Sequence, residues 1–252
     1  MIKKENDFTE ERKKIDEINR QIEELLEERF RLTNEIGMIK KNCSIDVEDR
    51  EREKFILNPC EGRIYDYYIR EIKKEILYNS KKEQDFLKYP SFFLVGMPGC
   101  GKSTLGKKIA FMLDIPFADT DRIIEHRENM TIEEIFKYKG EKYFREVEKE
   151  LVRELPRGFI VALGGGTPLF YNNLDILKKK GYMIYINKSL WELKNQILTG
   201  RPLMASPEDT EKLYNKRHSF FIDNSDFVFE DMSDYEYIFN ICEKIKNVRK
   251  DY

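Results

Sequence analysis

The first third of the chain repeats apolar residues at the spacing of an α-helix. Residues three, four or seven apart share one helical face, so the pattern predicts one long amphipathic helix from about residue 9 to residue 41. A second helix is expected after Asp49 and a third over residues 63–84. The apolar positions of the first helix are Ile15, Ile18, Ile22, Leu25, Leu32 and Ile36, and those of the third are Ile64, Tyr68, Ile72 and Ile76.

From about Ser91 onward, short apolar runs alternate with glycine-containing turns and amphipathic stretches. The runs SFFLV, IPFADTD, GFIVALGGGT, GYMIYI and DFVFE are expected to be five strands. Strands that alternate with helices predict a parallel sheet. Because Pro90 disfavours helical geometry at Tyr89, the boundary is placed near it. The chain is therefore expected to contain an all-α domain of residues 1–88 and an α/β domain of residues 89–252.

Composition excludes several classes of protein. The chain has 252 residues with 45 basic and 47 acidic side chains, and its net charge of −2 does not favour general nucleic-acid binding. No apolar run approaches the roughly 20 residues of a membrane span, and the N-terminus lacks the apolar core of a secretory signal. Four scattered cysteines match neither a disulfide framework nor a zinc site. These features predict a cytoplasmic protein without nucleic-acid or membrane partners.

Three cations continue the apolar face of the first helix, at Arg12, Arg29 and Lys40. Such positions are costly unless the cations meet anionic partners. At 1.5 Å per residue, Arg29 and Lys40 lie roughly 16 Å apart, whereas Arg12 lies about 25 Å from Arg29. If all three serve one small anion, Arg12 must come from a second copy of the chain in an antiparallel dimer. A coiled-coil or helix-bundle arm is the simpler alternative.

Together these residues resemble the all-helical chorismate mutases. The motifs of that family correspond to Arg12, Ile15–Asp16, Leu25–Arg29 and Gly37–Lys40 in the first helix, to Asp49, Arg52 and Glu53 in the second, and to Ser80 and Gln84 in the third. The resemblance covers residues 8–86. It implies a helical homodimer that converts chorismate to prephenate.

The same resemblance implies a role for each matched side chain. Arg29 and the partner chain's Arg12 would clamp the two carboxylates of chorismate. Lys40 and Gln84 would face the ether oxygen, and Glu53 would hold the ring hydroxyl. The remaining wall residues would be Asp49, Arg52 and Ser80. On spacing alone, Ser80 and Gln84 fit a solvated helix end equally well.

A second motif follows the strand SFFLV. The stretch GMPGCGKST matches the phosphate-binding pattern G-x-x-x-x-G-K-[ST] and precedes a predicted helix. Its backbone N–H groups would surround the phosphates of ATP, Lys102 would pair with the β and γ oxygens, and Ser103 would ligate Mg²⁺. The expected ATP-binding residues of the loop are Gly96, Gly99, Cys100, Gly101, Lys102, Ser103 and Thr104.

Further residues of the second domain suggest chemistry beside this loop. Alternation along IPFADTD places Asp119 and Asp121 on one side of a strand, where they suit a metal ligand and a hydroxyl-binding base. Cys100, at the start of a helix, is expected to react readily with alkylating agents.

The second domain resembles shikimate kinase, within the P-loop fold of the nucleoside-monophosphate kinases. The resemblance covers residues 91–252 and implies a five-stranded parallel sheet and phosphorylation of the shikimate 3-hydroxyl by Mg-ATP. The matching motifs are Asp119–Asp121, Gly140–Glu148, Gly164–Gly166, Arg201–Leu203 and Arg217, with Phe221 where the family has Tyr.

This resemblance also implies residue roles. Asp121 would bind the shikimate hydroxyls and act as base, while Asp119 and Ser103 would serve Mg²⁺. Arg145 and Arg217 would hold the carboxylate, with Glu148 orienting Arg145. The ring would lie against Gly164, Gly165 and Gly166, Arg201 would lie on a lid over the phosphoryl group, and Lys194 would contact the adenine.

The sequence therefore predicts a bifunctional enzyme of aromatic amino-acid biosynthesis. Two alternatives keep the kinase and change the role of the helical domain. In one, that domain senses chorismate or prephenate and modulates phosphorylation, and in the other it is a dimerising arm. Association with another enzyme of the same pathway is left open.

Overall fold

The computed structural model describes residues 8–58, 63–195, 206–230 and 233–252. The chain divides into two compact units, Met1–Leu87 and Lys88–Tyr252. No helix in the described ranges is both long and apolar enough to cross a membrane.

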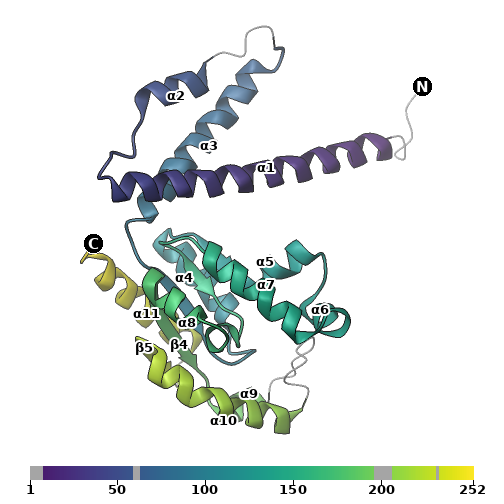
Figure 1. The fold of residues 1–252 in the computed structure, drawn as a ribbon, viewed down its shortest axis with the longest axis vertical. Helices are drawn as coiled ribbons and strands as arrows, with labels where there is room; N and C mark the ends of the chain where they lie inside the picture. The colour runs from purple at the N-terminus through teal and green to yellow at the C-terminus, as the bar shows by residue number, and fades with distance from the viewer. Residues whose placement is uncertain (1–7, 59–62, 196–205, 231–232) are drawn as a thin grey trace. The chain divides into compact units, whose positions relative to one another are not determined.

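The N-terminal unit consists of helices α1 (Thr9–Asn42), α2 (Arg50–Leu57) and α3 (Asp66–Phe86) (Figure 1). Helix α3 packs against both α1 and α2. Helix α1 packs tightly at Gly37, where an added Cβ would lie 2.6 Å from Cδ1 of Leu87, just after α3, and 3.0 Å from Gln84 Cγ. Gly37 therefore lets α1 lie directly against the part of α3 that carries Gln84.

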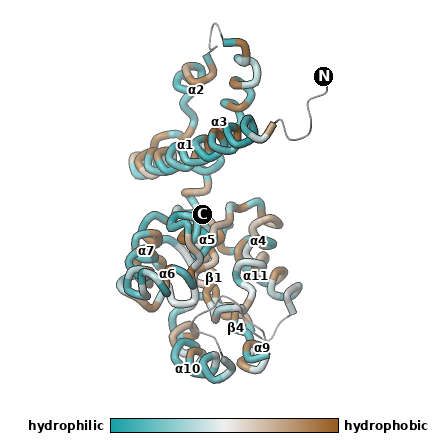
Figure 2. Tube along the Cα trace, turned by 90° about the vertical axis from the view of Figure 1, so that its right-hand side faces the viewer, coloured by the Kyte–Doolittle hydropathy of each residue, from teal (hydrophilic) through white to brown (hydrophobic). Residues whose placement is uncertain are grey.

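Much of the apolar surface of this unit is exposed. In Figure 2 apolar positions recur along α1 and α3, and Leu25 and Ile72 are 71% and 59% exposed. The buried residues among those described in this unit are Thr33, Gly37, Ser80, Phe86 and Leu87. A single copy of the helical unit thus has very little core.

The C-terminal unit is built on a sheet of five parallel strands in the order β2-β3-β1-β4-β5. This confirms the fold class expected for the second domain. Its strands are β1 (Ser91–Val95), β2 (Phe117–Asp119), β3 (Ile160–Ala162), β4 (Gly181–Asn187) and β5 (Phe227–Glu230).

Helices connect and cover these strands (Figure 1). The crossover through α4 runs toward one edge of the sheet and those through α8 and α10 run toward the other, so right-handed connections place them on opposite faces. The helices are α4 (Lys102–Leu113), α5 (Thr120–Glu128), α6 (Ile132–Tyr138), α7 (Gly140–Glu154), α8 (Asn173–Lys180), α9 (Leu190–Lys194), α10 (Pro207–Asn224) and α11 (Asp234–Arg249), with a 3₁₀ turn η1 (Thr167–Leu169).

The core of this unit follows the central strands. All five residues of β1 and all three of β3 are buried, as are Met183–Asn187 of β4. Central parallel strands covered on both faces are expected to be apolar throughout. The rigid sheet positions the loops at the carboxyl ends of β1, β2 and β3.

The second predicted strand is shorter than expected, and the expectation that Asp121 shares a strand face with Asp119 was wrong. Strand β2 ends at Asp119, whose Oδ1 accepts hydrogen bonds from the backbone N–H groups of Asp121 (3.1 Å) and Arg122 (3.3 Å). A carboxylate in this position caps a helix, so Thr120 begins α5. Asp121 consequently lies in the first helical turn rather than on the same strand face as Asp119.

Candidate active sites

The loop between β1 and α4 takes a shape that depends on glycine. Gly96, Gly99 and Gly101 have φ values of 152°, 82° and 94°, in the region that L side chains rarely adopt. At Gly96 an added Cβ would also lie 2.7 Å from both Ile186 O and Cys100 Sγ. The loop therefore closes tightly over the end of β4 and ends at the N-terminus of α4, where backbone N–H groups suit phosphate.

Lys102 lies folded against this loop. Its ammonium group donates to the carbonyls of Gly96 (3.1 Å) and Met97 (3.0 Å), and the side chain is only 9% exposed. Cys100 Sγ is 3.8 Å from Lys102 Nζ and the residue is fully buried. The expectation that Cys100 reacts readily with alkylating agents requires an accessible thiol, and the burial of Cys100 contradicts that accessibility.

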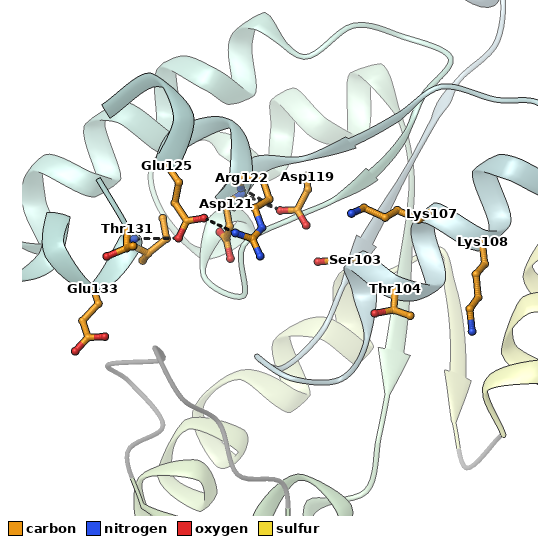
Figure 3. A pocket seen from close by; sticks show the side chains of 11 residues that line it. Ser103, Thr104, Lys107, Lys108, Asp119, Asp121, Arg122, Glu125, Thr131 and Glu133 are labelled. Atoms are coloured by element: carbon orange, nitrogen blue, oxygen red, sulfur yellow. Dashed lines mark hydrogen bonds and ion pairs between the residues drawn. The ribbon is translucent and has the colours of Figure 1, made fainter. Parts of the chain in front are cut away.

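A cavity of about 660 Å³ opens beside the start of α4. Ser103 and Asp119 point into it from α4 and from the end of β2 (Figure 3). The capping bonds of Asp119 use Oδ1 alone, which leaves Oδ2 for another partner. Oxygen ligands of this kind suit Mg²⁺. The cavity is lined by Ser103, Thr104, Lys107, Lys108, Asp119, Asp121, Arg122, Glu125, Thr131, Ile132 and Glu133.

Charged side chains converge on the three consecutive glycines after β3. An added Cβ at Gly164 would lie 2.7 Å from Asp121 Oδ1 and 3.0 Å from Glu148 Oε1. At Gly165 it would lie 3.3 Å from Arg217 Nη1, and at Gly166 it would lie 2.9 Å from Arg145 Nη1 and Nη2. Helices α5, α7 and α10 thus bring two acids and two arginines close to one stretch of glycine backbone.

Arg145 and Glu148 form a buried pair on α7. Arg145 Nη1 donates to Glu148 Oε2 at 2.7 Å, and Glu148 Oε1 accepts from Thr167 Oγ1 at 2.5 Å. Arg145 also donates to Glu141 and lies over the ring of Phe170, 4.1 Å from its centroid. Burial raises the pKa of Glu148, and Arg145 opposes that shift. These contacts hold the Arg145 guanidinium in one orientation.

Arg217 lies on α10 and donates to the carbonyl of Gly165 at 2.9 Å. It is 6% exposed, and burial lowers its pKa to about 10, with a further contribution from the charge of Arg145. The guanidinium stays charged at neutral pH. Two buried cations near each other form a natural site for a carboxylate, because guanidinium groups bind that group with paired hydrogen bonds.

Two further residues, Lys194 and Arg201, were expected at the ATP site, and the structure describes the first of them. Lys194, on α9, forms an ion pair with Glu211 on α10 at 2.6 Å. Arg201 and the rest of the Arg201–Leu203 motif lie outside the described residues.

Phe221 is fully buried, and its ring lies 5.2 Å from that of Tyr185.

Sequence reasoning missed two polar residues of this region. His218 belongs to none of the matched motifs, yet it is half-buried and its Nδ1 lies 2.9 Å from Tyr185 Oη. Thr167 was not identified either, and it holds Glu148. No sequence spacing marks either contact, because each joins separate elements.

The N-terminal unit contains a second cavity, of about 520 Å³. We call it the helical cavity. All three helices contribute to its walls, which consist of Arg29, Leu32, Thr33, Ile36, Lys40, Val47, Asp49, Arg52, Glu53, Ile56, Leu77, Ser80, Lys81 and Gln84. Of the eight residues to which the chorismate mutase resemblance gives a role, seven therefore line one space, and Lys81 was not anticipated.

Hydrogen bonds position several of these side chains. Arg29 donates to the hydroxyl of Ser80, which in turn donates to the carbonyl of Ile76 at 2.7 Å. Lys40 Nζ donates to the carbonyl of Val47 at 2.7 Å. Asp49 caps α2 by accepting from the backbone N–H of Arg52 at 2.9 Å. The site is thus fixed by one bond between α1 and α3, one from α1 to the loop before α2, one within α3 and one capping bond.

The electrostatics of the cavity depend on burial. Burial lowers the pKa of Arg29, and the nearby Glu83 opposes that shift. Burial also raises the pKa of Glu83 to about 7, against hydrogen bonding from Asn34 and the charge of Arg29. Gln84 Oε1 is buried without a hydrogen-bond partner, so it can accept from a ligand or water.

Arg12 does not line the helical cavity of its own chain. It is exposed on α1, 17 residues before Arg29, which corresponds to about 25 Å along the helix axis. A single copy therefore does not unite the full set of matched residues.

Comparison with known families gives two matches at separate parts of the chain. The family model for shikimate kinase matches residues 98–246, and the model for chorismate mutase type II matches residues 11–85.

Individual relatives match the C-terminal part. A shikimate kinase from Sulfurihydrogenibium sp. is 36% identical over 136 residues, covering 52% of this chain and 82% of the relative. One from Clostridium beijerinckii is 38% identical over 161 residues, covering 62% and 93%.

Solved structures give the same result. A shikimate kinase from Acinetobacter baumannii in complex with shikimate has a TM-score of 0.59 and 26% identity, covering 67% of this chain and 97% of that one. A shikimate kinase from Bacteroides thetaiotaomicron has a TM-score of 0.53 and 28% identity, covering 64% and 98%.

Proposed function

The chain belongs to the shikimate kinase family and carries a chorismate mutase type II domain at residues 11–85, and on that basis we propose two reactions. Residues 89–252 transfer the γ-phosphoryl group of Mg-ATP to the 3-hydroxyl of shikimate. Residues 1–88 rearrange chorismate to prephenate. Both belong to the biosynthesis of aromatic amino acids.

The observation that carries the kinase proposal is the convergence of Asp121, Arg145 and Arg217 on Gly164–Gly166. The two arginines bind the carboxylate of shikimate. That contact places a ring hydroxyl near the Asp121 carboxylate, which accepts its proton as the phosphoryl group is transferred. Glu148 keeps Arg145 oriented through their 2.7 Å ion pair.

The phosphate loop supplies the other half of the site. Lys102 exchanges its loop carbonyls for the β and γ oxygens of ATP, which are stronger acceptors because they are charged. Ser103 and Asp119 hold Mg²⁺, which when bound neutralises charge on the β and γ oxygens. Lys194, on α9, contacts the adenine.

The mutase reaction needs no nucleophile and no proton transfer. The protein holds the reactive conformer and stabilises charge that develops at the ether oxygen. In our proposal Arg29 binds a carboxylate, Lys40 and Gln84 face the ether oxygen, and Glu53 accepts from the ring hydroxyl. Asp49, Arg52 and Ser80 complete the wall. All seven of these residues line the helical cavity, which supports this assignment.

We further propose that the N-terminal helices form a homodimer, in which Arg12 of the partner chain completes each helical cavity. The exposed apolar residues of α1 and α3 support an interface there. A cytoplasmic location is consistent with the free thiols of Cys43, Cys100 and Cys242.

Two assays on one preparation test the proposed function. Loss of chorismate is measured without ATP, and formation of ADP is measured with shikimate and Mg-ATP. Lys102→Ala should lower phosphoryl transfer about a hundredfold or more, because a main positive charge on the β and γ phosphates is lost. The mutase rate should not change.

Lys246→Ala, on the exposed face of α11, is the matched control and should leave both rates unchanged. Full ATP-dependent activity in Lys102→Ala would contradict the assignment of the loop. Absence of chorismate turnover with normal kinase activity would favour a sensing or dimerising helical domain instead.

A further inference from the structure

Lys81 lies in the wall of the helical cavity, where no motif assigned it a role. It follows Ser80 on α3 and faces Glu53 of α2. Its ammonium nitrogen lies 2.8 Å from Glu53 Oε2, to which it donates a hydrogen bond, and 2.7 Å from Glu53 Oε1. The ion pair thus joins two helices at the residue that the proposed function assigns to the ring hydroxyl of chorismate.

The Glu53 side chain is the acid in this cavity that most needs a partner. Asp49, the other carboxylate of the wall, already accepts from the backbone of α2. The side chain of Glu53 is only 22% exposed, and its Oε1 carries no hydrogen bond although Lys81 is close. A carboxylate has about four lone-pair sites, so Glu53 can keep Lys81 and still accept from a substrate hydroxyl.

The charge of Glu53 also matters for a dianionic substrate. The other ionised side chains of the wall are Arg29, Lys40, Arg52 and Lys81 as cations and Asp49 as an anion. Without Lys81, the uncompensated negative charge of the partly buried Glu53 would line the same cavity as the bound carboxylates. Like charges at such distances repel appreciably in a partly buried site.

We propose that Lys81 is a positioning residue of the mutase site. Its ammonium group orients Glu53 and balances its negative charge. Glu53 can then accept a hydrogen bond from the substrate hydroxyl without repelling the two carboxylates of the substrate. This inference rests on the proposed mutase function of the helical cavity. Lys81 acts through Glu53 and is itself not required for the bond rearrangement.

The test compares steady-state chorismate kinetics of the full chain with those of five single variants and one double variant. Lys81→Met and Lys81→Gln remove the charge, Lys81→Arg keeps it, and Glu53→Gln removes its partner. Lys74→Met is the matched control, because Lys74 is exposed on the same helix and pairs with Glu71, three residues before it. Circular dichroism reports the helix content of each variant.

Lys81→Met and Lys81→Gln should raise KM on the order of tenfold, the size expected from one uncompensated charge at a partly screened site, and change kcat much less. Lys81→Arg should restore most of the affinity. Combining Lys81→Met with Glu53→Gln should cost no more than Glu53→Gln alone, because Lys81 then has no charge to neutralise.

Three results would overturn the inference alone. They are an unchanged KM in both uncharged variants, additive effects in the double variant, or a loss of helix content in both uncharged variants, which would make the pair merely structural. A wild-type chain that does not convert chorismate would instead overturn the proposed function, and the inference with it.

Discussion

Glu83 shows how the fold changes the chemistry of a single residue. It lies beside Gln84 on α3, half-buried, with Oε2 lacking a hydrogen-bond partner. Burial raises its pKa from 4.5 to about 7, even though Asn34 and Arg29 both favour the ionised form. The protonated carboxyl is therefore the form that the folded helical unit accommodates best at mildly acidic pH.

This shift makes the stability of the helical unit depend on pH. Because the folded-state pKa is raised, the folded chain binds a proton between about pH 4.5 and pH 7 that the unfolded chain releases. The stabilisation that proton binding by Glu83 gives to the folded unit is complete below about pH 4.5. It is lost as the pH rises through about 7. We expect α3 to be better protected at about pH 5 than at about pH 8.

Hydrogen exchange of α3 peptides, corrected for the intrinsic pH dependence of exchange, measures this protection. Glu83→Gln should flatten its pH dependence, since the amide does not titrate. Glu75→Gln, exposed on the same helix, should leave it as in the wild type. An identical pH dependence in Glu83→Gln and the wild type would exclude Glu83 as its source.

At the residue scale, the sequence predicted side chains that motifs mark and missed those that only packing makes important. Spacing identified Arg29 and Ser80, and the structure joins them by a hydrogen bond. It gave no signal for Lys81, whose partner Glu53 is 28 residues away. It also misjudged Cys100, because a loop sequence does not reveal which side chain turns inward.

Element boundaries followed hydrophobic periodicity closely where no other signal competed. The first helix was expected over residues 9–41 and spans Thr9–Asn42. The third was expected over residues 63–84 and spans Asp66–Phe86. The prediction of the second strand was wrong at its C-terminal end, because the sequence IPFADTD fits both the alternation of a strand and the capping residue of a helix. The cap at Asp119 prevailed because it satisfies two backbone N–H groups.

Helix α7 depends on a contact from the next helix. Lys180, the last residue of α8, donates to the carbonyls of Val152 (3.1 Å), Arg153 (2.6 Å) and Leu155 (2.6 Å) at the C-terminal end of α7. Those carbonyls have no partner within the helix. The contact anchors the helix that carries Arg145 and Glu148.

Lys180→Met keeps the apolar stem and removes the donor. It should destabilise the C-terminal unit by about 1–3 kcal/mol, because carbonyls in a partly buried position lose their partner. The midpoint of urea unfolding, followed by circular dichroism and by loss of kinase activity, measures the effect. Lys178→Met, exposed on the same helix, is the control. Equal midpoints in the two variants would contradict this role of Lys180.

At the scale of the whole molecule, the two units differ in how much they bury. The C-terminal unit has a continuous core along β1, β3 and β4. The helical unit buries few residues and exposes apolar side chains along α1. The change in composition near residue 88 predicted two different units. It could not predict how completely each one buries its apolar face, since that depends on contacts between helices and between copies.

The exposed face and the position of Arg12 lead to one prediction about assembly. Arg12 and Arg29 lie on one helix, about 25 Å apart, which is too far for both to bind one small dicarboxylate. An antiparallel partner would bring its own Arg12 beside Arg29, so each helical cavity would use residues from two chains. Arg12→Ala and Arg29→Ala chains should then each have almost no mutase activity alone.

Mixing the two inactive variants distinguishes a shared site from a site within one chain. A heterodimer of Arg12→Ala with Arg29→Ala contains one cavity with both arginines and one with neither. Refolding the two variants together should therefore restore up to about half of the wild-type activity per heterodimer, as two-fold symmetry requires. Kinase activity of the same samples reports the amount of folded chain. Heterodimers without recovery, or a monomer with full mutase activity, would refute the shared site.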